Sequence, residues 1–317
     1  MHSRGLLLIT AAALTVGLTA CGSGPSQVGS AAIIGDKVIA LDDVQSDLKW
    51  VLDNVPQVQQ QQKQHKLDLV SRELVSRRIQ HELIAIATRR ESLQIDEREV
   101  TEMINGSGGE VEAAKQNGDT PAKIREVARD ILLTQALGSH YFNKLSVTFD
   151  GVVIPVRAES GSSAKDRAQA LARQIADNPA RARDLMRTGA GPNAQVVVDQ
   201  QVTPALTERT GGAAWAGGPL FGAKAGTVIA FTPEDDNGSW LVVQVHDRKV
   251  LDPAPTNTQG KPQTLYKLGQ RVLSQLADEV GLKVNPRYGV WDPLAVNVAP
   301  RVEEATGVQI PVRRTTP

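Results

Sequence analysis

The longest helical pattern in the sequence begins at about Gln59 and ends near Glu91. Apolar residues recur in it at steps of three and four, the spacing of the buried face of an amphipathic helix; they are Leu67, Val70, Leu74, Val75, Ile79, Leu83 and Ile86. Neither proline nor glycine interrupts the stretch. Roughly thirty residues at 1.5 Å each predict a rod of about 45 to 50 Å, which other segments must cover.

Short elements flank this rod on both sides. Residues 31–34 and 37–39 predict two strands around a Gly35-Asp36 turn. A helix follows, which Asp42 and Gln45 are placed to begin as a capping box. After the rod, an extended link at 93–95 leads to a helix with acids in its first turn, where the helix dipole favours them; they are Asp96, Glu97 and Glu99.

Glycine and proline divide the next segment. The glycine cluster at 106–109 predicts a loop or hinge, and residues 110–116 predict a short helix. A turn then places Pro121 at the first position of another helix, because proline fits there without loss of a helical hydrogen bond. The apolar face of this helix comprises Ile124, Val127, Ile131, Leu132 and Leu137.

The period changes to that of strands from Val147 onward. The predicted order is strands at 147–149 and 152–156, a helix at 163–187 that Asn178-Pro179 divides, a strand at 195–198, a glycine-rich loop at 211–218 and a strand at 240–248. A proline-rich linker and an amphipathic helix at 264–283 follow. The pattern therefore predicts an α+β protein, with a disordered tail from residue 285 to residue 317.

The first twenty residues have the pattern of a secretory signal peptide. Arg4 precedes an apolar run at 6–18, and the run ends in Leu18-Thr19-Ala20-Cys21-Gly22, which is a lipobox. Cys21 is the only cysteine in the chain, so it allows neither an internal disulfide nor a cysteine metal site. We expect Cys21 to carry a lipid that anchors the mature chain to the extracytoplasmic face of the cell membrane.

Composition excludes several functions. The chain has 35 basic and 35 acidic side chains, so no positive footprint for nucleic acid is present. Only 3% of residues are aromatic, which argues against a site that stacks on sugars. His65, His81 and His140 lack the spacing of metal ligands, and the glycine-rich loop lacks the flanking strand and helix of a phosphate cradle. We therefore expect no metal and no cofactor.

The order of elements in the first half resembles the N-terminal chaperone domain of SurA and of PrsA-type foldase lipoproteins. The resemblance rests on the strand pair, the long helix, the Leu93-Gln94-Ile95 link and the Asp96-Glu97-Arg98-Glu99-Val100 helix start, and it covers roughly residues 31 to 142. In such proteins a helix after a second domain returns to complete the first. The helix at 264–283 has the corresponding position and apolar stripe, so we expect it to pack on the rod and not on the second domain.

The segment from Val147 resembles the parvulin fold of prolyl isomerases, through its strand, helix, strand and loop order and its last strand ending in Asp247-Arg248. Parvulins carry one histidine in the first strand and another near the start of the last. This chain has Val152, Val153 and Ile154 in the first strand, and Trp240 and Leu241 in the last. His246 lies near the strand end, outside the site by its spacing. The resemblance therefore implies a domain that has lost catalysis, and no residue receives a catalytic role.

The expected organisation is a signal peptide at 1–20, a tether at 21–30, a chaperone domain at 31–145, a parvulin-like domain at 146–250, a linker at 251–262, a return helix at 263–284 and a tail at 285–317. The expected function is that of a membrane-anchored chaperone for unfolded or newly secreted proteins, without prolyl isomerase activity. The apolar residues named as candidates for client binding are Trp50, Val51, Leu83, Ile86, Met103 and Ile104.

Two alternatives stay open at this point. One is an active parvulin-type prolyl isomerase that uses an atypical site, which an isomerisation assay would reveal. The other is a solute-binding lipoprotein, although the repeated βα units and aromatic pocket residues of that class are missing from the pattern.

Overall fold

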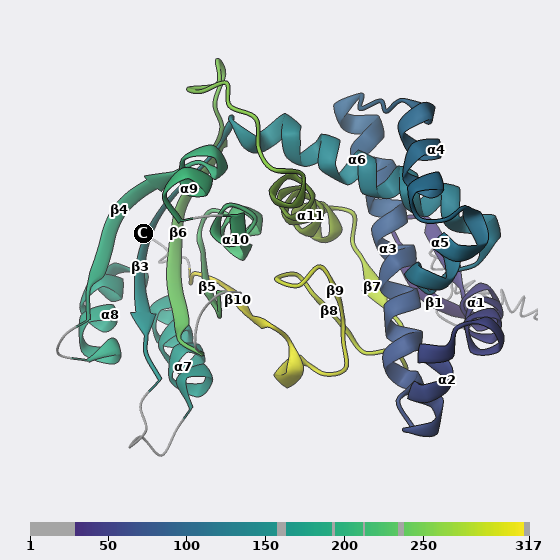
Figure 1. The fold of residues 1–317 in the computed structure, drawn as a ribbon. Helices are drawn as coiled ribbons and strands as arrows, with labels where there is room; N and C mark the ends of the chain where they lie inside the picture. The colour runs from purple at the N-terminus through teal and green to yellow at the C-terminus, as the bar shows by residue number, and fades with distance from the viewer. Residues whose placement is uncertain (1–28, 157–162, 192–193, 212, 234–237, 314–317) are drawn as a thin grey trace, which may run out of the picture.

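The computed structural model describes residues 29–156, 163–191, 194–211, 213–233 and 238–313. It is an α+β fold, as the sequence predicts. Figure 1 shows a helical part on one side, a sheet with its own helices on the other, and α11 (Pro262–Glu279) between the two. We call residues 30–142 together with 262–284 the helical part. Residues 145–250 together with 307–311 form the sheet part.

A small sheet joins the two ends of the helical part. β1 (Ser30–Ile34) pairs with β2 (Lys37–Ala40), as predicted, and on its other side with β7 (Lys283–Val284). The chain thus returns to its first strand after about 250 residues of intervening sequence. α1 (Leu41–Asn54) follows β2, but the predicted capping box is wrong, because Ala40 is the N-cap residue and Asp42 lies in the first turn.

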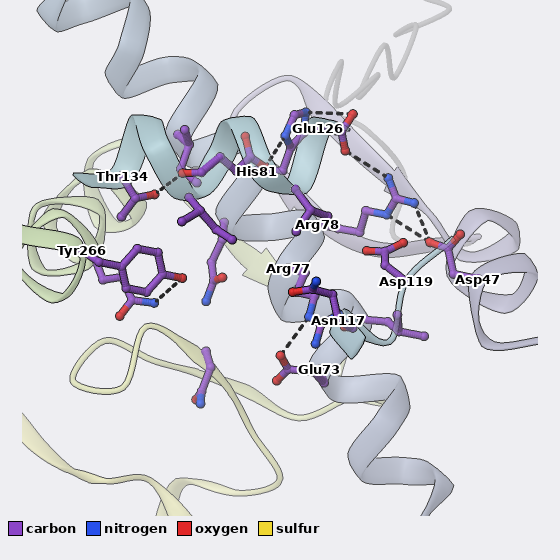
Figure 2. A pocket seen from close by; sticks show the side chains of 18 of the residues that line it. Asp47, Glu73, Arg77, Arg78, His81, Asn117, Asp119, Glu126, Thr134 and Tyr266 are labelled. Carbon is purple, nitrogen blue, oxygen red and sulfur yellow. Dashed lines mark hydrogen bonds and ion pairs between the residues drawn. The ribbon is translucent and has the colours of Figure 1, made fainter. Parts of the chain in front are cut away.

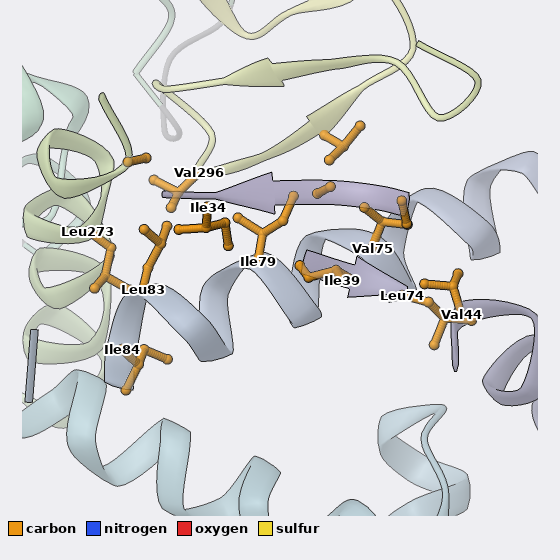
Figure 3. Close-up of a cluster of buried hydrophobic side chains, with 14 of the residues drawn as sticks. Ile34, Ile39, Val44, Leu74, Val75, Ile79, Leu83, Ile84, Leu273 and Val296 are labelled. Carbon is orange, nitrogen blue, oxygen red and sulfur yellow. The ribbon is translucent and has the colours of Figure 1, made fainter. Parts of the chain in front are cut away.

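The predicted rod is two helices. α2 (Pro56–Lys63) ends before α3 (Leu67–Glu91), because the chain turns at His65 with a φ of 57°. α3 has 25 residues and is therefore about 38 Å long, shorter than predicted. Its buried face supplies more residues to the helical core than any other element, and β1, α11 and the loop at Val296 pack against it (Figure 3). The labelled core side chains are Ile34, Ile39, Val44, Leu74, Val75, Ile79, Leu83, Ile84, Leu273 and Val296.

The elements after α3 match their predicted order. The carboxylate of Asp96 accepts the backbone N–H of Arg98 at 2.8 Å and begins α4 (Glu97–Gly106). α5 (Glu110–Asn117), the 3-10 helix η1 (Pro121–Lys123) and α6 (Ile124–Phe142) follow. Val100, Ile104 and Ile124 pack together in a small separate core of α4, α5 and α6.

α11 lies unusually close to α6. A Cβ atom on Gly138 would lie 1.8 Å from the carbonyl oxygen of Leu265, and one on Gly269 would lie 2.0 Å from that of Thr134. These glycines let the two backbones touch. α11 also packs on α3 and on residues of the sheet part, so the expectation that it avoids the sheet part is wrong. Leu273 and Leu276 enter the helical core, whereas Leu268 enters a core of the sheet part.

The sheet part contains five strands in the order β10-β5-β6-β3-β4, and all neighbours are antiparallel. The strands are β3 (Leu145–Ile154), β4 (Val196–Val202), β5 (Thr227–Phe231), β6 (Trp240–Val250) and β10 (Gly307–Pro311). The two strands predicted at 147–156 form the single strand β3, with irregular pairing near Phe149 and Gly151.

Different elements cover the two faces of the sheet. α7 (Ala164–Asp177), the 3-10 helix η2 (Pro179–Arg181) and α8 (Ala182–Ala190) cover one face, with the break at the predicted Asn178-Pro179. The opposite face packs on α11, the end of α6 and the 3-10 helix η3 (Pro219–Gly222). The predicted glycine-rich loop is wrong, because α9 (Pro204–Gly211) and α10 (Ala213–Ala216) occupy much of it.

The predicted disorder of the tail is wrong as far as residue 313. β8 (Val290–Asp292) pairs with β9 (Asn297–Ala299), and the 3-10 helix η4 (Val302–Glu304) leads to β10. Tyr288, Val296 and Val298 pack in the helical core, while β10 forms one edge of the sheet. The tail therefore connects the two parts because its apolar residues are divided between their cores.

Two sequence predictions lie outside the described residues. The signal peptide and Cys21 precede residue 29, and so does most of the predicted tether. Among the described helices, none combines the length and the apolar composition needed to cross a membrane.

Candidate functional site

The six apolar candidates for client binding do not form one surface. Trp50 and Val51 lie on α1, Leu83 and Ile86 on α3, and Met103 and Ile104 on α4. Three of them are core residues: Val51 and Leu83 are fully buried, and Ile104 is 4% exposed. These three side chains are not accessible to a client in this conformation, and a role for the six residues in client binding stays a prediction. Trp50, Ile86 and Met103 are half-buried and lie at the margins of two different cores.

The helical part instead contains a polar cleft of about 370 Å³ between α3, α6 and α11 (Figure 2). Side chains at helical spacing line it from both sides: Glu73, Arg77 and His81 from α3, and Glu126, Asp130 and Thr134 from α6. Positions four residues apart share a face of a helix, so each helix presents a polar stripe to the other. The other polar lining residues are Asp47, Arg78, Gln80, Asn117, Asp119, Tyr266, Gln270 and Asn297.

Ion pairs hold one end of the cleft together. Arg78 donates through Nη2 to Asp47 Oδ2 at 2.5 Å, and Lys123 donates to the other oxygen of Asp47. Asp47 is 4% exposed, so a single buried carboxylate joins α1 to α3 and to η1. Arg77 pairs with Glu73 at 3.0 Å and also donates to the carbonyl oxygens of Asn117 and Gly118, which fixes the loop after α5.

His81 links α3 to α6 in the same cleft. Its Nδ1 lies 2.8 Å from Asp130 Oδ2, and its Nε2 lies 3.7 Å from Glu126 Oε2. The hydrogen bond to Asp130 raises the pKa of His81 above its usual value, with smaller contributions from the charges of Asp130 and Glu126. The protonated imidazole is thus favoured between two carboxylates.

Asp119 is the least compensated carboxylate of the cleft. It is 7% exposed, and its Oδ1 accepts the backbone N–H of Thr120 at 2.8 Å. Burial raises the pKa of Asp119, because desolvation disfavours the charged form. Figure 2 shows this side chain beside Asp47 and Arg78. No cationic nitrogen of the described residues lies within ion-pair distance of its oxygens.

The positions that correspond to a parvulin site are filled by hydrocarbon. Leu241 pairs with Val153 across β6 and β3, and Trp240 pairs with Ile154. Leu241 is 9% exposed and packs in the same apolar core as Phe221 and Phe231. These side chains offer no group that donates or accepts a proton at this point of the sheet.

His246 belongs to a polar cluster that the sequence analysis missed. Its Nε2 lies 3.2 Å from Oδ1 of Asp150, which is 1% exposed. Arg183 donates to Asp150 at 2.8 Å and to Asp199 at 2.8 Å, and the backbone N–H of Asp199 donates to Asp150 at 2.7 Å. The cluster therefore joins β3, β4, β6 and α8. The separation of these residues in the sequence hid the connection.

Asp150 is the centre of this cluster. Burial by itself raises the pKa of Asp150, but the hydrogen bonds from Arg183, from the Asp199 amide and from His246 together outweigh it, so the pKa lies below its usual value. Side-chain atoms of Asp150, Asp199 and His246 lie within 4.8 Å of one another and are chemically able to ligate a divalent cation. The guanidinium group of Arg183, however, already supplies the positive charge between the two carboxylates.

Comparison with known proteins identifies a distant similarity to a solved structure. No protein-family model matches the chain, and no curated protein matches it. Among solved structures, it is similar to the foldase protein PrsA from Lactococcus lactis, with 15% sequence identity and a TM-score of 0.29. The similarity covers 81% of this chain and 94% of that chain.

Proposed function

We propose that this protein is an extracytoplasmic chaperone that binds unfolded or newly secreted proteins and is tethered to the membrane through lipidated Cys21. The observation that carries the proposal is the path of the chain, which leaves the helical part after α6, forms the sheet part and returns in α11. This path supports the resemblance to SurA-like chaperones, which implies the same return. It also leaves a polar cleft between α3, α6 and α11.

The proposal includes the absence of prolyl isomerase activity. An isomerase must stabilise the twisted amide of the transition state more than the planar ground state. Leu241 and Val153, at the corresponding place in the sheet, offer only apolar atoms, and Leu241 is packed in a core. The absence of polar groups at this place supports a sheet part that acts as a structural support for the helical part.

Suppression of aggregation tests the chaperone proposal. The mature chain with Cys21→Ser retains every described residue and is suited to solution assays. We expect it to reduce light scattering from a chemically denatured client when the two are present in similar amounts. An unrelated protein of equal concentration is the control, and scattering identical to that control would reject the proposal.

Two experiments in cells test the membrane anchor and the clients. We expect Cys21→Ala to abolish labelling by an alkyne fatty acid and to leave the signal peptide attached, whereas a label on the Cys21→Ala protein would contradict the lipobox assignment. Crosslinking in intact cells, followed by identification of the crosslinked partners, should recover secreted proteins in unfolded form. Recovery of one folded partner in fixed proportion would instead indicate a dedicated complex.

A further inference from the structure

We propose that the polar cleft binds the cationic side chains, lysine or arginine, of an extended polypeptide. This inference rests on the proposed function and names the part of a client that the helical part recognises. It concerns the cleft between α3, α6 and α11, whose lining residues are described above.

The charges of the cleft favour a cation. Its lining contains five carboxylates and two guanidinium groups; the carboxylates are those of Asp47, Glu73, Asp119, Glu126 and Asp130. Lys123 pairs with Asp47 from outside the lining, and His81 adds one more charge when it is protonated. With all five carboxylates ionised, five negative charges face four positive ones when His81 is protonated and three when it is neutral.

Two of the carboxylates can accept further hydrogen bonds or ion pairs. Asp47, Glu73 and Asp130 each have a cationic or imidazole partner within 3.0 Å. Glu126 has its nearest partners at 3.7 Å from His81 and at 4.0 Å from Arg78, at the limit of an ion pair. Asp119 has only the Thr120 amide on Oδ1, and no described residue donates a hydrogen bond to its Oδ2.

The state of Asp119 is the strongest sign of a missing partner. A buried carboxylate normally has a compensating cation or several donors, because an uncompensated buried charge costs several kcal/mol. Asp119 is 93% buried, lines the cleft and has one donor. An ammonium or guanidinium group that entered the cleft would supply the missing donors to Asp119 and Glu126.

The size and the walls of the cleft fit a long basic side chain. A volume of about 370 Å³ is near the lower end of ligand pockets, which span about 300 to 1,000 Å³. The apolar lining residues are Leu74, Ile84, Val127, Ile131 and Ala295, and Tyr266 also lines the cleft. Lysine and arginine place methylene groups on such surface while the charged end reaches polar groups.

Fluorescence anisotropy with a labelled peptide tests the inference directly. The probe is a flexible glycine-serine peptide with arginines at intervals, and the matched probe replaces each arginine by citrulline, which keeps the shape and removes the charge. We expect the mature Cys21→Ser chain to bind the arginine peptide at least tenfold more tightly than the citrulline peptide, a difference of about 1.4 kcal/mol. Equal affinity for the two peptides would overturn the proposal.

Variants locate the binding in the cleft. We expect Asp119→Asn and Glu126→Gln each to weaken binding of the arginine peptide about fivefold to tenfold, because each removes one charge from a charge-assisted hydrogen bond. Asp43→Asn and Glu102→Gln are the controls, since both side chains are exposed and neither lines the cleft. Equal loss in the controls would show a diffuse charge effect and overturn the assignment. If Asp119→Asn fails to fold, the Glu126→Gln result decides the matter.

Two further arms separate the cleft from neighbouring explanations. Spermidine carries ammonium groups, as lysine does, without a polypeptide; if it binds as tightly as the arginine peptide, the cleft is a site for small cations and the polypeptide assignment is wrong. Light scattering from an aggregating client is measured in parallel. If the protein suppresses aggregation but does not prefer the arginine peptide, the proposal for the cleft is rejected and the chaperone proposal stands. If it prefers the arginine peptide but does not suppress aggregation, the chaperone proposal is rejected and the cleft remains a binding site for basic peptides.

Discussion

The helical part and the sheet part differ in the side chains that they place beside α11. Ionisable side chains surround an open space between α3, α6 and α11, whereas aliphatic and aromatic side chains fill the sheet face that packs on α11. A cleft lined by polar groups that lack partners can bind a ligand. A close-packed apolar core has no room for one unless its packing is disrupted. This difference underlies our proposals that the helical part binds the client and that the sheet part supports it.

The largest expected effect comes from the contact between α6 and α11, the helix that contributes to the cores of both parts. A Cβ atom added by Gly269→Ala would lie 2.0 Å from a backbone oxygen of α6, so the helices must move apart. We expect a loss of about 3 kcal/mol or more in the free energy of unfolding, measured with urea. Hydrogen exchange should increase in both parts, since α11 contributes to both cores.

Gly106→Ala is the matched control for this substitution. A Cβ atom on Gly106 meets nothing within 4 Å, and the residue ends α4 far from α11 in sequence. Its effect should be below about 1 kcal/mol. If Gly269→Ala were as mild as this control, the close approach of α6 and α11 would not hold the two parts together.

The second effect is confined to the sheet part. Asp150→Asn keeps the shape of the side chain but removes the charge that Arg183 and His246 face, at a cost of about 1 to 3 kcal/mol. The pKa of Asp150 lies below its usual value, so its contribution is present above about pH 4 and is lost as the pH falls through the lowered pKa. Increased hydrogen exchange in β3 and β4 checks this prediction.

Asp184→Asn provides the comparison for Asp150→Asn. Asp184 pairs with Arg187 on the same helix and is 69% exposed, so its loss should change stability by less than about 0.5 kcal/mol. Exchange that rises in α3 and α6 as strongly as in β3 would show that the cluster at Asp150 does not belong to the sheet part alone.

The smallest effect concerns the cleft of the helical part. The pKa of His81 is raised, so the stabilisation from its protonated form is complete below about pH 6.5 and is lost as the pH rises through the raised pKa. The melting temperature of the wild type should exceed that of His81→Gln by more at pH 6 than at about pH 9. The corresponding change in the free energy of unfolding between the two pH values should be below about 1 kcal/mol, because the ion pair is partly exposed.

The charged groups around His81 set the direction of this effect. Asp130 and Glu126 on α6 and Glu82 on α3 favour the protonated ring. His65→Asn is the control, because His65 is exposed and asparagine tolerates its φ of 57°. A melting difference for His81→Gln that stays constant with pH would show that folding does not raise the pKa of the imidazole, and would contradict this prediction.

The hydrophobic pattern of the sequence predicts individual helices and strands better than it predicts which of them pack or pair with one another. The stripe at Leu74, Ile79 and Leu83 was sufficient to predict a buried helix, since periodicity reports which face is covered. The turn at His65 escaped prediction because no glycine or proline marks it. β10 escaped because Val308 and Ile310 alternate for only a few residues and find their partner strand far away in the sequence.

The same reasoning explains what was missed at the cleft. Glu73, Arg77 and His81, like Glu126, Asp130 and Thr134, stand at helical spacing in the printed sequence. That spacing is equally typical of a solvent-exposed face, and only the packing of α3 against α6 turns the two stripes toward one another. The search for client-binding residues considered apolar positions alone, so it named core residues such as Val51 and Leu83.

The central claim is that the helical part binds clients and that the sheet part has no isomerase activity. Refolding of a client whose slow step is proline isomerisation tests this claim most directly. With the mature chain present in amounts similar to the client, we predict a higher yield of folded client and an unchanged slow phase of tens to hundreds of seconds at 25 °C. A slow phase that accelerates at catalytic amounts of the protein, and returns to the uncatalysed rate with Leu241→Ala, would contradict the account by placing an active isomerase in the sheet part.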